Sequence, residues 1–256
     1  MCMVAAAGVA FLQPIPQPQA YHHFSDQRIV FGVANGLDVL SNLAFFISGL
    51  LGLIFVLKAG LTMDAGTRWA FATLFFGLVL TSFGSAYYHL EPDNQRLVFD
   101  RLPMIIAMSG CVGAVVADRF GGATAWSLTG LIAIGLWTVH QWSVSEQLGR
   151  GDLRWYALYE GLIFCVSALL LWLFPSRNGA TPAFVIAGVG NIAAKVFELL
   201  DKPIYGLGGI VSGHTLKHLS AGLAFLPLVF LIRKIGKERM VDDSMRPDLA
   251  AAGFER

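Results

Sequence analysis

Long apolar stretches constrain this chain more than any other feature of its sequence. Seven of them are long enough for a helix to cross the ~30 Å hydrocarbon core of a membrane, which takes about 20 residues. Because lipid offers no partner for backbone polar groups, each stretch is expected to be an α-helix. The sequence therefore predicts an all-α polytopic membrane protein with a bundle of seven transmembrane helices. The predicted spans are roughly residues 38–58, 68–90, 102–120, 123–142, 155–174, 182–200 and 209–232.

The composition agrees with a chain that lies in lipid. Of its 256 residues, 55% are hydrophobic and 14% are charged, whereas soluble domains carry about a quarter charged residues. The formal net charge is +1, and the sequence has no basic stripe that would predict binding to nucleic acid. The 3 cysteines share no metal-binding spacing and indicate no disulfide framework.

The chain divides into three parts. Residues 1–37 are an N-terminal apolar and polar segment, residues 38–232 the transmembrane domain, and residues 233–256 a tail expected to be cytoplasmic and disordered. Residues 1–13 fit either a partial helix or a signal-like segment, although they lack the positive region of a signal peptide. The excess of Lys and Arg directly after the last span predicts a cytoplasmic C-terminus. These residues are Arg233, Lys234, Lys237 and Arg239.

Polar side chains inside the predicted spans are the candidates for chemistry, because a charge at the membrane centre costs ~2.5–3.5 kcal/mol on insertion scales. Ser85 and His89 lie four residues apart near the end of the second span, and therefore on one helix face. His214 and His218 have the same spacing in the seventh span, and Asp100 opens the third. These three helix ends share one side of the membrane, which is the outer side if the C-terminus is cytoplasmic. We therefore expect the five side chains to meet near the outer face.

Three histidines with a nearby carboxylate and hydroxyl favour a catalytic zinc site. Three imidazoles leave the fourth coordination position of zinc open for water. Asp100 and Ser85 would supply the groups for proton transfer and oxyanion stabilisation. Other interpretations stay open at this stage: a structural polar cluster between helices, a bis-histidine haem site, a retinal site at Lys217, or a receptor.

The arrangement of these motifs resembles the alkaline ceramidases and the wider CREST superfamily, which includes the adiponectin-type receptors. The resemblance extends from Tyr21 to about Leu231 and includes Ser41-Asn42 at the start of the first span. It implies a seven-helix membrane hydrolase of bacterial type, in a bacterial inner membrane with its active site toward the outer face. The implied reaction is cleavage of the N-acyl bond of ceramide or a similar N-acyl lipid to a free amine base and a fatty acid. The alternative is a zinc-binding receptor or structural protein of the same superfamily without hydrolysis.

The resemblance also implies a role for each motif residue. The metal, Zn²⁺, would be held by His89, His214 and His218. Asp100 would hold and deprotonate the water, and Ser85 would support the site from one turn below His89. The substrate would be a membrane lipid, and nothing in the sequence indicates an oligomeric state.

The segment before the first span departs from the eukaryotic ceramidases, in which an acidic segment with Trp and Asn binds calcium. Here it reads Tyr21-His-His-Phe-Ser-Asp-Gln-Arg28, and Gly36 stands where a Glu is expected. Asp26 and Asp38 keep carboxylates, but Arg28 among them opposes cation binding. Calcium binding is therefore doubtful, and the exact lipid substrate stays open with it.

Two further expectations concern polar residues outside the histidine motifs. His22 and His23 lie in a polar segment and are expected to be solvated. Lys195 and Glu198 lie three residues apart in the sixth span and are expected to form an intramembrane ion pair.

Overall fold

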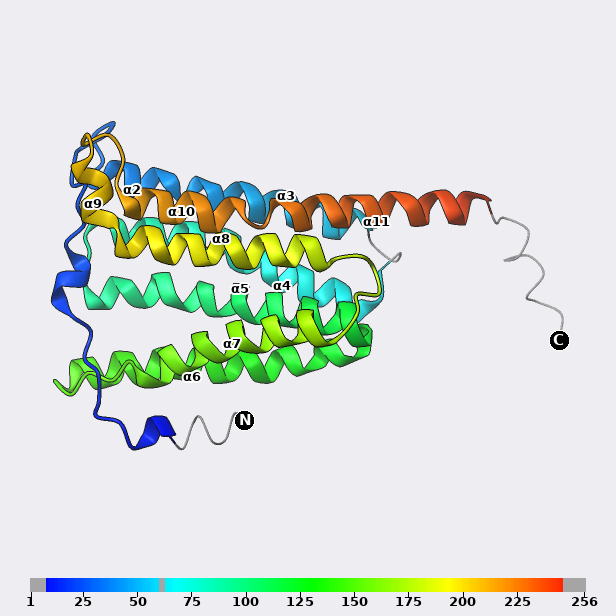
Figure 1. Ribbon diagram of the computed structural model, residues 1–256, viewed down its shortest axis with the longest axis horizontal. Helices are drawn as coiled ribbons and strands as arrows, with labels where there is room; N and C mark the ends of the chain where they lie inside the picture. The colour runs from blue at the N-terminus through cyan, green and yellow to red at the C-terminus, as the bar shows by residue number, and fades with distance from the viewer. Residues whose placement is uncertain (1–7, 60–62, 246–256) are drawn as a thin grey trace.

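The computed structural model describes residues 8–59 and 63–245, which form an elongated bundle of roughly parallel and antiparallel helices (Figure 1). Within these residues no β-strand forms, and Val30 and Val33 make only an isolated bridge. The elements are η1 (Gln19–His22), α2 (Gly36–Ser41), α3 (Leu43–Ala59), α4 (Ala65–Leu90), α5 (Asn94–Phe120), η3 (Gly122–Ser127), α6 (Leu128–Gln147), α7 (Arg154–Leu173), α8 (Thr181–Leu199), α9 (Asp201–Gly206), α10 (Gly213–Leu223) and α11 (Leu226–Met245).

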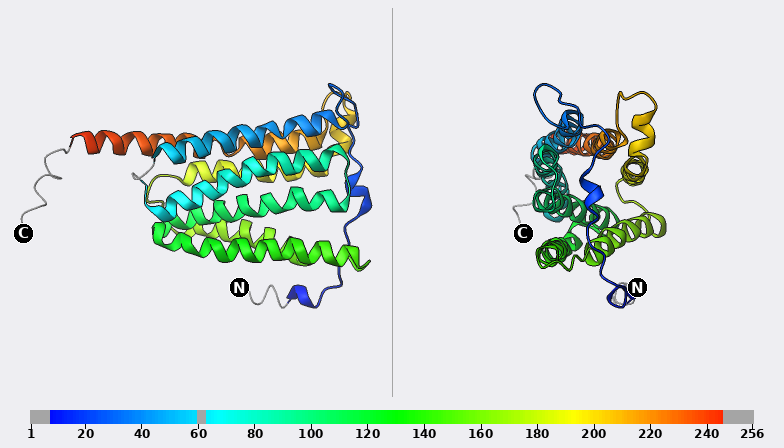
Figure 2. Two further views of the ribbon diagram at one scale, coloured as in Figure 1. Left: turned by 180° about the vertical axis from the view of Figure 1, so that it is seen from behind. Right: turned by 90° about the vertical axis from the view of Figure 1, so that its left-hand side faces the viewer.

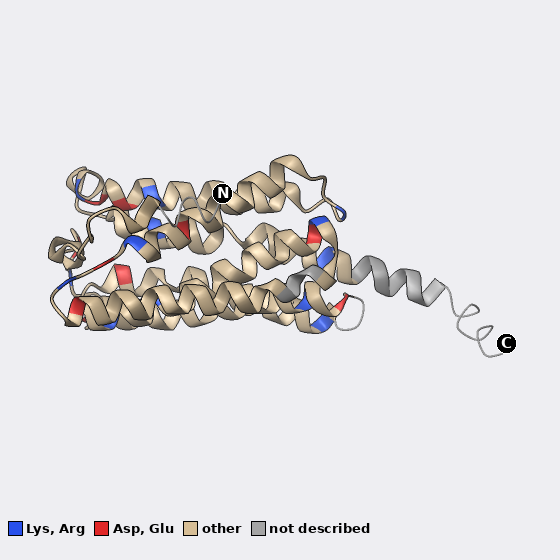
Figure 3. Cartoon of the chain, turned by 90° about the horizontal axis from the view of Figure 1, so that it is seen from below, with Lys and Arg blue, Asp and Glu red and all other residues tan. Residues whose placement is uncertain are grey.

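Six helical segments among the described residues are long and apolar enough to cross a membrane. They are Gly36–Ala59, Ala65–Leu90, Asn94–Phe120, Arg154–Leu173, Thr181–Leu199 and Gly213–Gly236. The predicted fourth span corresponds to α6, which has 20 residues but is less apolar, so the count of seven is not confirmed. Charged residues lie mainly toward the two ends of the bundle (Figure 3), as expected for a protein whose middle lies in lipid.

Short polar side chains determine where three of the helices begin. Asp64 accepts a hydrogen bond from the backbone N–H of Thr67 at the start of α4, over 2.9 Å. Asp93 does the same at the start of α5, and Ser212 at the start of α10. Such caps satisfy backbone donors that have no partner within the helix. The caps of α5 and α10 therefore define where Asp100 and His214 enter the bundle.

Glycines next to the candidate site residues allow close helix contacts there. A Cβ atom at Gly84 would lie 2.0 Å from the carbonyl oxygen of Phe99, so α4 and α5 touch directly beside Ser85 and Asp100. A Cβ atom at Gly213 would lie 2.2 Å from the carbonyl oxygen of Phe197, so α10 touches α8 beside His214. Larger residues would push these helices apart and separate the polar side chains that they bring together.

Residues 14–28, which we call the N-terminal strap, cross the end of the bundle where α4 ends and α10 begins (Figure 2, right). The carbonyl oxygen of Ile15 accepts a hydrogen bond from Leu153 N, which joins the strap to the start of α7. Gln17 N donates to Glu146 at the end of α6, over 2.6 Å. The strap therefore touches elements that are far apart in the sequence and covers one end of the bundle.

The two ends of the chain differ in how they compare with expectation. At the C-terminal end α11 is helical to Met245, and the expectation of a disordered tail after residue 232 stays a prediction. Residues 246–256 lie outside the described residues. At the N-terminal end residues 8–10 are helical, and the rest of the ambiguous segment 1–13 is either irregular or outside the described residues.

Candidate metal centre and its surroundings

His89, His214 and His218 meet at the strap-covered end of the bundle, as their spacing predicted. One ligand nitrogen from each lies within 4.8 Å of the others. The Nε2 atoms of His89 and His214 are 3.3 Å apart, and every pair of ring centroids is separated by 4.8 Å. His89 comes from the last turn of α4, and the other two come from successive turns at the start of α10. All three side chains are buried, so the group is held by the packing of two helices.

The orientation of His218 is set by the start of the first span. Its Nδ1–H donates to the carbonyl oxygen of Asp38 (3.1 Å) and to the hydroxyl of Ser41 (2.8 Å). The Ser41 hydroxyl itself donates to the Asp38 carbonyl oxygen over 2.9 Å. With the proton on Nδ1, the Nε2 lone pair of His218 is available to a metal. Such outer hydrogen bonds are a general feature of histidines that bind metals.

Asp100 and Ser85 lie together, and Ser85 is one turn before His89 on α4. Both side chains are buried, and the Ser85 hydroxyl is within hydrogen-bonding reach of the Asp100 carboxylate. Asp100 does not belong to the group of ligand atoms formed by the three histidines. The structure therefore has two groups of polar side chains. The three histidines form the group that could hold a metal, and Asp100 with Ser85 forms a separate pair.

His214 has two neighbours that sequence reasoning missed. Its backbone N–H donates to Oδ1 of Asp201 over 2.8 Å, and Oδ2 of the same carboxylate accepts from the backbone N–H of Ser25 in the strap. The ring of Phe24, also from the strap, lies 4.4 Å from the His214 ring and 4.6 Å from the His89 ring. The strap thus places an apolar ring directly on two of the three histidines. No local sequence pattern marks Phe24 or Asp201 for this position.

A second polar cluster lies next to the histidines, around Glu198. Lys195 pairs with Glu198 over 2.6 Å, so the predicted ion pair is confirmed. Lys217 also pairs with Glu198, over 2.5 Å, and the Tyr21 hydroxyl donates to the same carboxylate over 3.1 Å. Burial raises the pKa of the Tyr21 phenol, which keeps it protonated as a donor. Lys217, considered from the sequence only as a site for retinal, instead holds α10 against α8.

The expectation that His22 is solvated is wrong. His22 is buried, with Nδ1 2.9 Å from the Tyr88 hydroxyl and Nε2 2.8 Å from Asn94 Oδ1. It therefore fastens the strap to the end of α4 and the start of α5. His23 is exposed, as expected. His22 is the last residue of η1 and His23 is its C-cap, and of these two adjacent side chains one faces the bundle and the other faces away.

The carboxylate of Asp26 is occupied by Arg28. The guanidinium donates to both oxygens, over 2.8 and 2.7 Å, and also to the carbonyl oxygen of Ile210. These bonds hold the pKa of Asp26 below its usual range. Asp38 lies elsewhere: its Oδ1 accepts hydrogen bonds from Ser212 and Thr215. The two carboxylates left from the calcium-binding pattern therefore have separate partners, and Oδ2 of Asp38 has none among the described residues, so the doubt about calcium binding stays a prediction.

The three histidines fit a zinc ion in their donor chemistry and in their spacing. In a tetrahedral site with zinc–nitrogen distances of ~2.0–2.1 Å, two ligand nitrogens lie about 3.3–3.4 Å apart. The two Nε2 atoms of His89 and His214 have this separation, 3.3 Å. The third nitrogen lies within 4.8 Å of both, a distance that a small side-chain rotation can shorten. The group could therefore hold a metal ion, and its identity as zinc is a proposal.

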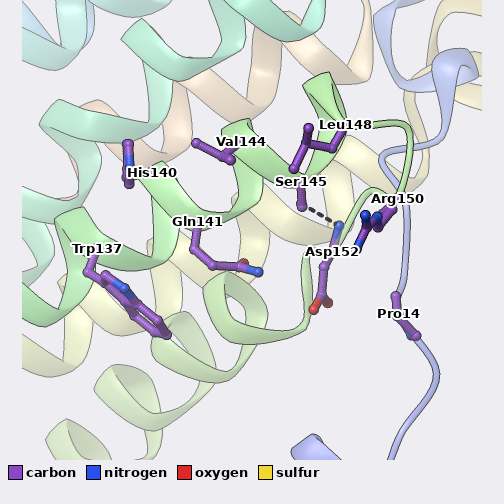
Figure 4. Close-up of a pocket in the computed structure, with 9 residues that line it drawn as sticks. All are labelled: Pro14, Trp137, His140, Gln141, Val144, Ser145, Leu148, Arg150 and Asp152. Atoms are coloured by element: carbon purple, nitrogen blue, oxygen red, sulfur yellow. Dashed lines mark hydrogen bonds between the residues drawn. The ribbon is translucent and has the colours of Figure 1, made fainter.

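A cavity lies away from the histidines, at the C-terminal end of α6 (Figure 4). It has a volume of about 420 Å³ and is lined by α6 and by the loop that leads to α7. In this loop the backbone N–H of Asp152 donates to the Ser145 hydroxyl. The cavity is open and includes none of His89, His214 and His218. Its volume therefore gives no support to the metal centre.

Comparison with models of known protein families found no match, and comparison with curated protein sequences found none either. The resemblance to the ceramidases accordingly stays an expectation that rests on the motif residues alone. The structure adds that these residues converge in one buried site within a helical bundle that has membrane-spanning character.

Proposed function

We propose that this protein is a membrane-embedded, zinc-dependent amidase that cleaves the N-acyl bond of ceramide or a similar N-acyl lipid. The observation that carries the proposal is the meeting of His89, His214 and His218 beside the Asp100–Ser85 pair in an apolar bundle. Three histidine ligands with a nearby carboxylate are typical of hydrolytic zinc sites, in which one coordination position stays open. A purely structural metal site is usually closed by a fourth protein ligand.

The proposal includes a seventh span and an orientation. α6 lies beside α5 and α7 over much of their length (Figure 1), so it would cross the membrane with them despite its lower hydropathy. The basic residues that begin with Arg233 and Lys234 favour a cytoplasmic C-terminus. Seven spans then place the histidines near the outer face, in a bacterial inner membrane.

In the proposed reaction, bound zinc would supply Lewis acidity to the scissile carbonyl and lower the pKa of a water molecule toward ~7. The Asp100 carboxylate takes one proton from the attacking water and passes it to the leaving amine nitrogen. The Ser85 hydroxyl orients that carboxylate. The hydrogen bonds of His218 Nδ1 to Asp38 and Ser41 hold its ring in place. The products are a fatty acid and a free amine, so one water is consumed for each amide bond that is cleaved.

The substrate would enter sideways from the bilayer. The strap covers the outer end of the bundle, and Phe24 lies against the histidine rings there. The helices differ in how much of their apolar stretch is buried inside the protein. Only 11% of this stretch is buried in α7 and 22% in α8, against 50% in α4. These two helices expose large apolar side chains such as Trp172 and Ile186, which suit contact with acyl chains.

One observation favours a second candidate, a metal-binding membrane protein without hydrolysis. Phe24 is 5% exposed and packs on His89 and His214, so the strap shields part of the site. A receptor or structural protein would need no access for a lipid amide. The two candidates differ in whether an intact site turns over substrate.

The test is zinc content and amide hydrolysis measured on the same preparations of wild type and Asp100→Asn. We expect about one zinc per chain in both, and turnover lower by ~10²-fold or more in the variant, the usual scale for loss of a general acid–base group. Asp152→Asn makes the same chemical change at the same end of the bundle and should keep its activity. Full activity in Asp100→Asn would refute the mechanism. Zinc binding without cleavage of any N-acyl lipid would favour the second candidate.

A further inference from the structure

Arg101 is held in a fixed orientation directly after Asp100 in α5. Its side chain is buried, with 6% exposed, and its guanidinium lies 4.0 Å from the ring centroid of Trp142 and 4.6 Å from that of Tyr156. Nη2 donates to Oε1 of Gln17 in the strap over 2.7 Å. Two aromatic faces and one amide therefore hold a charged group that has little freedom to turn.

The charge of Arg101 has no anionic partner among the residues that the structure describes. Its Nη1 atom is inaccessible to solvent and has no hydrogen-bond acceptor within that part of the chain. The nearby carboxylate of Glu146 instead accepts from Gln17 N and Trp142 Nε1. Arg119, the other buried arginine described, pairs with Asp118 at the opposite end of the same helix. A buried cation without an anionic partner is costly, so an acceptor from outside the chain is expected at Nη1.

Arg101 directly follows Asp100, the proposed catalytic carboxylate, so an acceptor bound at Arg101 would lie near the proposed reaction. The inference therefore rests on the proposed amidase function. Consecutive Cα atoms are ~3.8 Å apart, and consecutive side chains of a helix diverge by about 100°. Asp100 thus faces Ser85 on α4, while Arg101 faces the ends of α6 and α7. The two side chains nevertheless interact electrostatically. An anionic group on a lipid whose amide lies at Asp100 would therefore be attracted by the Arg101 charge, and a small movement of the strap around Gln17 would give it access to Nη1.

We propose that Arg101 binds an anionic group on the amine part of the lipid substrate, close to the scissile amide. A guanidinium presents its N–H donors in a planar fork that matches carboxylate, phosphate and sulfonate oxygens. Ceramide offers only hydroxyl groups at this place, which do not require a buried cation. The preferred substrate class is therefore an N-acyl lipid with an anionic amine part, such as an N-acyl amino acid. The carboxylate of the fatty acid product is the other possible source of the anion.

The test compares two lipids that share an acyl chain and an amide. N-palmitoylglycine ends in a carboxylate and N-palmitoylethanolamine in a neutral hydroxyl. Kd is measured at pH 7 on the full-length, zinc-loaded protein in detergent, in the Asp100→Asn background so that both lipids persist. We expect N-palmitoylglycine to bind about 10-fold more tightly or better, the usual scale for a hydrogen bond to a charged group. A parallel pair, palmitate and hexadecanol, tests the product carboxylate.

Variants assign the preference to one side chain. Arg101→Gln should bring the ratio of the two Kd values to about one, and Arg101→Lys, which keeps the charge without the fork, to an intermediate value. Arg96→Gln is the matched control on the same helix end, because Arg96 already pairs with Glu91 and should not affect the ratio. If Arg101→Gln does not fold, Arg101→Lys still provides the test.

The outcomes separate this inference from the proposed function. Equal binding of the two N-acyl lipids to the Asp100→Asn protein, or a preference that survives both Arg101 variants, overturns the inference even if the wild type hydrolyses lipids. A preference that depends on Arg101, without hydrolysis of any lipid by the wild type, supports the anion site and refutes the amidase. Arg101-dependent binding of palmitate alone overturns the assignment to the amine part and assigns the anion to the product.

Discussion

Removal of the Ser41 hydroxyl should weaken zinc binding, although Ser41 would not touch the metal. Ser41 lies at the start of the first span and accepts a hydrogen bond from His218 Nδ1 over 2.8 Å. The same Nδ1–H also points to the carbonyl oxygen of Asp38, over 3.1 Å. In Ser41→Ala the shorter bond is lost and the longer one remains. The His218 ring then has more freedom to rotate away from the position in which Nε2 faces the other histidines.

The magnitude follows from what is lost and what stays. One hydrogen bond contributes ~0.5–1.5 kcal/mol net, which corresponds to about 2-fold to 13-fold in an equilibrium constant. Loss of all outer hydrogen bonds to a metal-binding histidine typically costs 10–100-fold in affinity. Because the Asp38 carbonyl oxygen is still present, we expect the lower end of that range, roughly 10-fold weaker zinc binding.

The assay is competition for zinc between the purified protein and a chromophoric chelator. Ser48→Ala is the matched control. Ser48 lies seven residues further along the same span, is fully buried, and its hydroxyl has no hydrogen-bond partner among the described residues. Both variants remove one buried hydroxyl, but only Ser41→Ala removes a bond to His218. Equal zinc affinity in the two variants would refute the reasoning, and so would an unchanged affinity in Ser41→Ala.

Three further predictions concern the strap and the topology. Because Arg28 occupies both oxygens of Asp26, activity should persist when calcium is removed by a selective chelator; recovery of lost activity on adding calcium would contradict this. The pKa of Asp26 is held below its usual range by Arg28, so the stabilisation is fully present above the ordinary carboxyl pKa of ~3.9 and lost only as the pH falls through the lower folded value. Hydrogen exchange of residues 20–28, corrected for intrinsic rates, should therefore show equal protection at pH 5 and pH 8, and opening at pH 5 would count against the pair. In a background without native cysteines, single cysteines at the exposed positions Glu91 and Lys234 should react with impermeant reagent from opposite sides of the membrane, with Glu91 outside. Reaction from one side would exclude an odd number of spans between them.

The sequence by itself determined the helical architecture and the members of the candidate metal centre. Apolar stretches of about 20 residues leave a membrane chain no alternative to helices, so most helices of the bundle follow from local composition. Helical spacing placed Ser85 with His89 and His214 with His218 on single helix faces. The alternation of spans then brought those faces to one end. Helix spacing and the order of the spans are local or topological properties. A prediction based on them stays correct even if the predicted helix ends are wrong by a few residues.

Only the tertiary structure decided what surrounds the centre. Phe24 covers two histidine rings, Asp201 binds the backbone of His214, and Lys217 is bound by Glu198. Such contacts depend on the rotation and depth of each helix, which are set by close packing at positions such as Gly84. Likewise, no pattern in the sequence shows that the charge of Arg101 has no carboxylate partner among the described residues. That outcome depends on where every neighbouring side chain comes to rest, because hydrogen bonds act over about 3 Å and a helix rotates its side chains by about 100° per residue.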